Sequence, residues 1–99
     1  RGGAAPMIRV RAGKRRITVS GHAGHAPVGQ DIVCAAVSAL TYALAGYLEE
    51  AEQAARSDIR RGYADIEGAG DCGVAFALVR CGMEQLAAAY PDCVEMTGS

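Results

Sequence analysis

The chain has 99 residues, a formal net charge of −1, 51% apolar residues, four cysteines and no tryptophan. This length fits one domain with one core, so we expect residues 7–99 to form that domain and residues 1–6 to be an added or disordered segment. The balanced charge indicates neither a nucleic-acid nor a membrane partner, and no apolar run is expected to be long enough to cross a bilayer.

Two strands are expected at the start of this domain. Residues 8–11 alternate isoleucine and valine with arginine, which is the pattern of a half-buried strand, and residues 16–20 repeat the alternation. A turn at residues 12–14 joins them, because Gly13 adopts a positive φ at little cost. The pattern therefore predicts an amino-terminal hairpin.

A glycine-rich loop and a long helix follow the hairpin. Residues 21–30 read GHAGHAPVGQ, and their three glycines and one proline predict a loop. Asp31 is the expected N-cap of the helix. Residues 32–48 are apolar on nearly every side, which predicts that the first turns are buried, whereas the end of the helix from Glu49 is exposed.

The remaining elements are predicted from shorter patterns. Asp71 is the expected cap of a second helix, which Pro91 ends because a residue before proline avoids the α region. Three further strands are expected, at residues 57–60, 63–67 and 94–96. The resulting order is β-β-α-β-β-α-β, which favours an α+β fold with a mostly antiparallel sheet packed with two helices. Because alanine is abundant, few large residues are expected in the core: Leu40, Leu44, Leu48, Phe76, Leu78 and Leu86.

Charge and cysteine usage indicate the environment of the protein. The basic residues of the amino-terminal third all precede the first acid, Asp31. We interpret them as the solvated face of the hairpin, because no aromatic residues alternate with them. No secretory apolar segment precedes the four cysteines, Cys34, Cys72, Cys81 and Cys93. We therefore expect a cytoplasmic protein with reduced thiols.

Cys34 is the candidate nucleophile, because it lies in the predicted first turn of the first helix. Unpaired N–H groups and a partial positive charge at a helix start favour the thiolate over the thiol. His22 stands at the predicted end of the second strand, where it would meet Cys34 across the loop as a base. Spacing alone leaves an inert core cysteine open as the alternative.

The sequence around this pair resembles the signature of the ribosomal-processing cysteine proteases. In that family a strand end reading GHA is followed by a glycine-containing loop and a helix reading DIVCAAVSAL, and the same letters stand here at residues 21–23 and 31–40. The spacing of histidine and cysteine also agrees. The MIRV start, the tyrosine-proline close of the second helix and the final strand extend the resemblance over residues 7–97.

The resemblance implies a cysteine endopeptidase with His22 and Cys34 as its catalytic dyad. Members of the family remove an amino-terminal extension from large-subunit ribosomal protein twenty-seven before or during ribosome assembly. They prefer a hydrophobic, aromatic-ended cleavage motif and work as homodimers. The loop between the dyad residues is thought to close over the substrate, so Gly24, Pro27 and Gly29 are expected to act as its hinges.

The role of Asp31 stays open between two alternatives. In the expected mechanism His22 takes the Cys34 proton, the thiolate attacks the peptide carbonyl, and helix-start N–H groups bind the oxyanion. As a cap, Asp31 would accept the N–H of Cys34 and oppose formation of the thiolate. Alternatively, it would orient His22.

Gly21 and Ser38 are supporting candidates, and no metal or other cofactor is expected. Ser38 lies one helical turn beyond Cys34 on the same face, and its role rests on the family motif. The alternative is a hydroxyl bonded to its own backbone. His22 and His25 have an H-x-x-H spacing that suits zinc, but no second pair of ligands accompanies them.

One segment departs from the family pattern. Residues 54–70 are short and arginine-rich, where relatives often have a longer, more acidic strand pair. A second class of function also stays open: a ribosome- or RNA-associated binding module without protease activity. Such a module would use the basic hairpin, and its binding would weaken with salt. Its expected contacts are Arg9, Arg11, Arg15 and Arg16.

Overall fold

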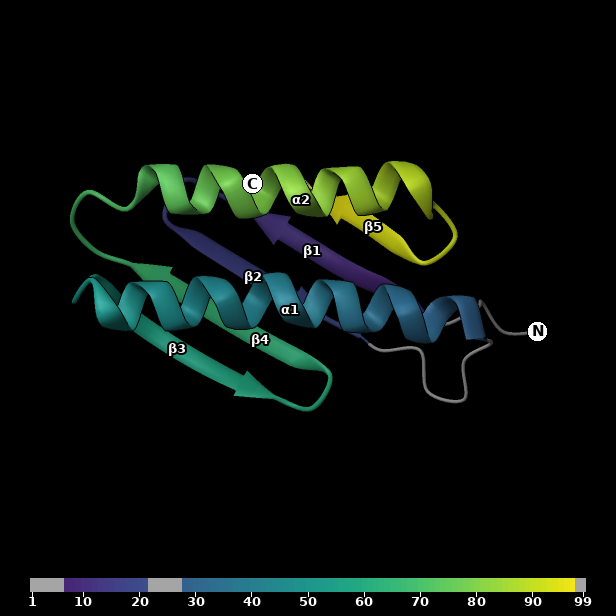
Figure 1. The fold of residues 1–99 in the computed structure, drawn as a ribbon, viewed down its shortest axis with the longest axis horizontal. Coiled ribbons are helices and arrows are strands. Elements are labelled where there is room, and N and C mark those ends of the chain that lie inside the picture. The colour runs from purple at the N-terminus through teal and green to yellow at the C-terminus, as the bar shows by residue number, and fades with distance from the viewer. Residues whose placement is uncertain (1–6, 22–27, 98–99) are drawn as a thin grey trace.

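The computed structural model describes the backbone of residues 7–21 and 28–97, and the side chains of residues 7–21 and 32–97. Residues 1–6, expected to stand outside the domain, are outside the described residues. The elements are β1 (Ile8–Ala12), β2 (Arg16–Ser20), α1 (Val28–Glu50), β3 (Ala54–Arg60), β4 (Tyr63–Gly68), α2 (Gly73–Ala89) and β5 (Val94–Thr97). This order confirms the predicted α+β fold (Figure 1).

The five strands form one sheet in the order β3-β4-β2-β1-β5. All neighbours are antiparallel except β1 and β5, which are parallel. Both helices lie across the same face of this sheet, and they run side by side in Figure 1. The opposite face carries the polar side chains of the alternating strands, as expected for an antiparallel sheet with one solvated side.

The core lies between the sheet and the two helices. Alternate residues of β1 and β2 are buried, namely Ile8, Val10, Ala12, Ile17 and Val19. Of the large residues predicted for the core, Leu44, Leu48 and Phe76 are buried, and Leu40 and Leu86 pack against its edge. Leu78 is 71% exposed, so its prediction is wrong. The reason is that α2 packs through Phe76, Val79 and Met83, and Leu78 lies on another side of the helix.

Two predicted helix starts are also wrong. Helix α1 begins at Val28, three residues before the predicted cap Asp31, so the preceding loop is shorter than residues 21–30. A glycine inside a helix costs only about 0.5–1 kcal/mol, which a long helix tolerates. Helix α2 has Cys72 at its N-cap without a side-chain hydrogen bond, so Asp71 does not cap it.

Helix α1 is buried on one face only. Val33, Val37, Leu44 and Leu48 face the sheet, whereas Ile32, Tyr42 and Tyr47 are exposed, so the prediction of fully buried first turns is wrong. Contrary to expectation, the stretch Ile32–Glu50 is long and apolar enough to cross a membrane, judged by length and composition alone. Core helices of soluble proteins meet the same criterion, and here one face of α1 packs on the sheet.

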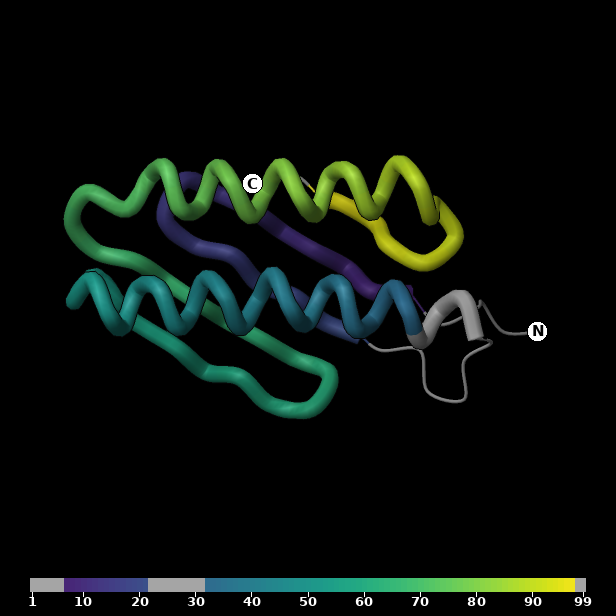
Figure 2. Tube along the Cα trace, in the orientation of Figure 1, coloured from purple at the N-terminus to yellow at the C-terminus, as the bar shows by residue number. Residues whose placement is uncertain are grey.

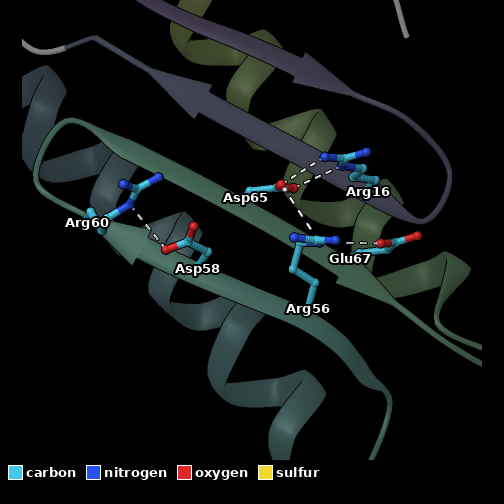
Figure 3. A network of polar contacts seen from close by, with 6 residues as sticks. All are labelled: Arg16, Arg56, Asp58, Arg60, Asp65 and Glu67. Atoms are coloured by element: carbon cyan, nitrogen blue, oxygen red, sulfur yellow. Dashed lines mark hydrogen bonds and ion pairs between the residues drawn. The ribbon is translucent and has the colours of Figure 1, made fainter.

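The uncovered face of the sheet carries a network of ion pairs around Asp65 (Figure 3). The side chain of Asp65 is only 6% exposed. Arg16 donates two hydrogen bonds to it, from Nε to Oδ1 at 2.9 Å and from Nη2 to Oδ2 at 2.8 Å. Asp58 of β3 lies directly opposite Asp65 of β4. Repulsion between two carboxylates at such a position would destabilise the sheet if no cations were near. The surrounding arginines offset this repulsion, because Arg56 lies 4.0 Å from Asp65 and Arg60 lies 3.3 Å from Asp58.

This network makes stability depend on pH. The hydrogen bonds from Arg16 are the largest cause that lowers the pKa of Asp65 below its usual value, against the opposing effect of burial. A lowered pKa stabilises the fold above the unfolded pKa of about 3.9, and the gain is lost as pH falls through the folded value. We expect Asp65→Asn to lower the free energy of unfolding by about 1–3 kcal/mol at pH 7. Urea titrations from pH 7 to pH 3 should show the two proteins converging as the wild-type carboxylate is protonated.

Asp58→Asn is the matched control, because its side chain is 45% exposed and pairs with Arg60 on the same strand. Exposed pairs contribute little, so a change within about 0.5 kcal/mol is expected at pH 7. An equal loss for Asp65→Asn at every pH would show that the charge of Asp65 is not what stabilises the fold.

Candidate active site

A cleft of about 460 Å³ lies beside α1 and contains the predicted nucleophile. Its lining residues come from three parts of the chain: helix α1 (Cys34, Val37, Ser38, Thr41 and Tyr42), strands β1 and β2 with the residue after β2 (Ile8, Val19 and Gly21), and the β3–β4 hairpin (residues 59–64). Cys34 is partly buried in this cleft and is the only cysteine among these lining residues. The described part of the site therefore contains one thiol, set between a helix and the sheet.

Gly21 places the end of β2 at this cleft. Its N–H donates a 2.9 Å hydrogen bond to the carbonyl oxygen of Gly62, in the turn between β3 and β4. Gly21 has a φ of +94°, and a Cβ added there would clash with the main-chain oxygen of Met7. Only glycine fits this position. The chain thus leaves the sheet at the cleft, one residue before His22, which itself lies outside the described residues.

The position of Cys34 within α1 differs from the predicted one. Because the helix begins at Val28, Cys34 lies in the second turn instead of the first. Its N–H is therefore not among the first four, which lack partners inside a helix. The expected oxyanion donors at a helix start beside Cys34 are not found there, and the effect of the helix dipole fades beyond the first turn.

The lining residues of α1 follow helical spacing from Cys34. Ser38 lines the same cleft, as its spacing of one turn predicted, and it is exposed. Thr41 and Tyr42 lie a further turn along the same face and were missed, although the period of 3.6 residues would have found them. The Thr41 hydroxyl donates to the carbonyl oxygen of Val37 at 2.8 Å, so it is already bonded.

The remaining predicted site residues lie between Gly21 and Cys34 in the chain. Gly24, Pro27 and His25 lie outside the described residues together with His22. Gly29 and Asp31 belong to α1, but their side-chain surroundings are outside the described residues. Among the residues that the structure describes, no three histidine, cysteine or acidic side chains group as metal ligands.

The β3–β4 hairpin is a further part of the cleft that the sequence does not predict. Residues 60–63 form its tip, with Arg60 paired to Tyr63 across a two-residue turn. Strand pairing brings the tip to the cleft, because Tyr63 also pairs with Ser20 at the end of β2. Figure 2 shows this turn beside the end of β2, below the amino-terminal half of α1. No local signal in the sequence reports such a long-range register.

A known protein family matches nearly the whole chain. The family described as cysteine protease Prp matches residues 7–95 of the chain. A curated relative from Mycoplasma pneumoniae, the ribosomal processing cysteine protease Prp, is 40% identical over 52 residues, which is 52% of either chain. The matched part thus spans about half the length of that relative.

Solved structures share the fold over nearly the whole chain. A protein from Streptococcus mutans has a TM-score of 0.75 at 27% identity, covering 98% of this chain and 96% of its own. The ribosomal processing protease Prp from S. aureus, solved with a substrate peptide, has a TM-score of 0.73 at 16% identity, covering 95% and 99%. At that identity the second likeness shows the fold alone.

Proposed function

The chain belongs to the Prp family of cysteine proteases, and we propose that it is an endopeptidase with Cys34 as nucleophile and His22 as base. The observation that carries the proposal is that Cys34 and Gly21 line one cleft, although they come from different elements. His22 follows Gly21 directly in the chain. This adjacency in the chain supports His22 as the base that would act on the Cys34 thiol.

The reaction would proceed through a thioester. His22 removes the proton from the Cys34 thiol, and the thiolate attacks the carbonyl carbon of the scissile peptide bond. The tetrahedral intermediate collapses, the C–N bond breaks, and the imidazolium of His22 gives its proton to the departing amine. Water then hydrolyses the thioester, with His22 again acting as base, and the carboxylic acid is released.

We propose the amino-terminal extension of large-subunit ribosomal protein twenty-seven as the substrate, cut before or during ribosome assembly. The name of the Mycoplasma pneumoniae relative supports ribosomal processing as the role. The S. aureus protease was solved with a substrate peptide and also with a covalently linked product peptide, which supports a peptide substrate and covalent catalysis.

We also propose that the protein is a cytoplasmic homodimer. All four cysteines are free thiols, which suits a reducing compartment. A second hollow of about 400 Å³ lies between α1 and α2, and the exposed apolar side chains around it would suit a second copy: Tyr47, Val74 and Leu78.

The alternative of an RNA-associated binding module has less support. Arg9 is bound to Glu95 at 3.1 Å and Arg16 is bound to Asp65, so acidic residues already occupy two of its four expected contacts. Arg15 donates to the carbonyl oxygen of Gly70 at 2.7 Å. The uncovered sheet face is therefore mixed in charge, whereas phosphate binding favours a surface of uniformly positive potential.

The test is cleavage of a peptide that copies the amino terminus of the host's ribosomal protein twenty-seven. We expect one cut, identified by the masses of both products, and loss of cutting when iodoacetamide alkylates Cys34. Peptide mapping should show that the substrate protects Cys34 but not the exposed Cys81. An uncut peptide, or cutting that survives complete alkylation of Cys34, would refute the proposal.

A further inference from the structure

We propose that the β3–β4 turn makes the cleft selective for peptides that carry an acidic side chain close to the scissile bond, with Arg61 as its main contact. The inference rests on the proposed protease function and names a determinant of its specificity.

The end of β3 and the turn that follows it hold two arginines at a defined place beside the cleft. Arg60 and Arg61 both line the cleft that contains Cys34. The turn comprises only Arg61 and Gly62, since Arg60 pairs with Tyr63 across it. The hydrogen bond from Gly21 to Gly62 ties it to the end of β2. Because the turn has only two residues and is hydrogen-bonded to the end of a neighbouring strand, the backbone position of Arg61 is restrained.

The two arginines differ in their surroundings. The Nε of Arg60 lies 3.3 Å from a carboxylate oxygen of Asp58, and its guanidinium lies 4.9 Å from the centre of the Tyr63 ring. These contacts hold Arg60 and neutralise part of its charge. Arg61 is exposed, and within the described part of the chain the structure contains no ion pair to it. Arg61 is thus the guanidinium that remains available to a bound peptide.

The charge of the lining favours an anion over a cation. Among the cleft residues that the structure describes are two arginines and no acid. The other lining side chains are neutral: aliphatic groups, hydroxyls, two tyrosines and the Cys34 thiol. A bound peptide would displace water from the cleft and strengthen the attraction between Arg61 and a carboxylate. The planar guanidinium matches a carboxylate with two parallel hydrogen bonds, so Asp or Glu fits better than Asn or Gln.

The experiment uses a series of amidated peptides with one position changed among Glu, Gln and Lys on either side of the scissile bond. Amidation removes the terminal carboxylate, so any preference belongs to a side chain. For wild type we expect one position at which Glu raises kcat/KM about tenfold over Gln, mostly through KM, with a smaller ratio at high salt. Arg61→Gln should bring the ratio near one, and Arg61→Glu should favour Lys.

Arg80→Gln is the matched control, because Arg80 is an exposed arginine of α2 that does not line the cleft. It should keep the wild-type ratio. Equal cleavage of Glu and Gln peptides at every position, or a preference that survives in Arg61→Gln, would overturn the inference and leave the protease intact.

Binding to Cys34→Ala separates this inference from the proposed function. Fluorescence anisotropy with the same peptides should show the preference for Glu without any chemistry. If wild type cuts no peptide but the preference for Glu appears in binding, the protease proposal fails and the selectivity stands. If neither cutting nor a binding preference appears, both fail.

Discussion

Cys34→Ala should lower kcat/KM for peptide cleavage by a factor on the order of 10⁴ or more, because removing a catalytic nucleophile leaves only binding and residual electrostatic catalysis. No other cysteine lines the described cleft, so no neighbouring thiol is placed to replace it. The fold should survive, because Cys34 is only partly buried and packs at the edge of the core. Steady-state kinetics and a thermal melt of the same sample give both quantities.

Cys81→Ala is the control for this experiment. Cys81 is the exposed cysteine, lies on α2 and is absent from the cleft lining, so its loss should leave both kcat/KM and the melting temperature close to wild type. A Cys34→Ala protein that kept a tenth of wild-type activity would exclude Cys34 as the nucleophile. Ser38, the exposed hydroxyl of the same cleft, would then be the candidate nucleophile.

Much of the fold was predictable because the strands alternate cleanly. In β1, valine and isoleucine point to the core and the arginines between them point to solvent, so the pattern reports both strand and face. The helices were harder to orient. Alanine, valine and leucine occur all round α2, so only packing against the sheet decides that Val79 is buried and Leu78 is exposed. The predicted start of α1 is three residues too late, because Gly29 is a residue type that favours a loop although it lies inside the helix.

The site was predictable only where its residues are close in sequence. Gly21 and Cys34 flank one short segment, and the family motif covers both, so their meeting at one cleft could be expected. Arg61 could not be assigned to the site, because its place depends on the pairing of β4 with β2. Helix α1 and strand β3 separate these two strands in the sequence, so no local pattern reports their pairing.

Gly21→Ala should strongly destabilise the fold, although it adds only one methyl group at a position outside the core. A φ of +94° is unfavourable for alanine, and its Cβ would clash with the main-chain oxygen of Met7, which no side-chain rotation relieves. A non-glycine residue at such a φ lowers the free energy of unfolding by on the order of 1–3 kcal/mol, and the clash with Met7 adds to this cost. In a domain of this size, each 1 kcal/mol lowers the melting temperature by about 4–8 °C. We therefore expect a fall of roughly 10–20 °C.

Activity should fall further than the loss of folded protein explains. Relief of the clash requires the end of β2 to move away from Met7, which weakens the hydrogen bond to Gly62 and redirects the chain into His22. A displacement of about 1 Å between catalytic groups costs on the order of 100-fold in rate. Cleavage assayed well below the melting temperature, where the variant is fully folded, should therefore show a reduced kcat.

Alanine substitutions at two other glycines separate the cost of the positive φ from the cost of the clash. Gly70 has a φ of +73° but open space around an added Cβ, so Gly70→Ala carries the conformational cost without the clash. Gly46 lies within α1, also with open space, and Gly46→Ala should raise stability by up to about 1 kcal/mol through helix propensity. A melting temperature for Gly21→Ala equal to that of Gly70→Ala would mean that the clash relaxes at no cost. A normal kcat for Gly21→Ala would mean that the end of β2 does not position the base. The reason is that the added methyl group affects catalysis by Cys34 through the strand end that precedes His22.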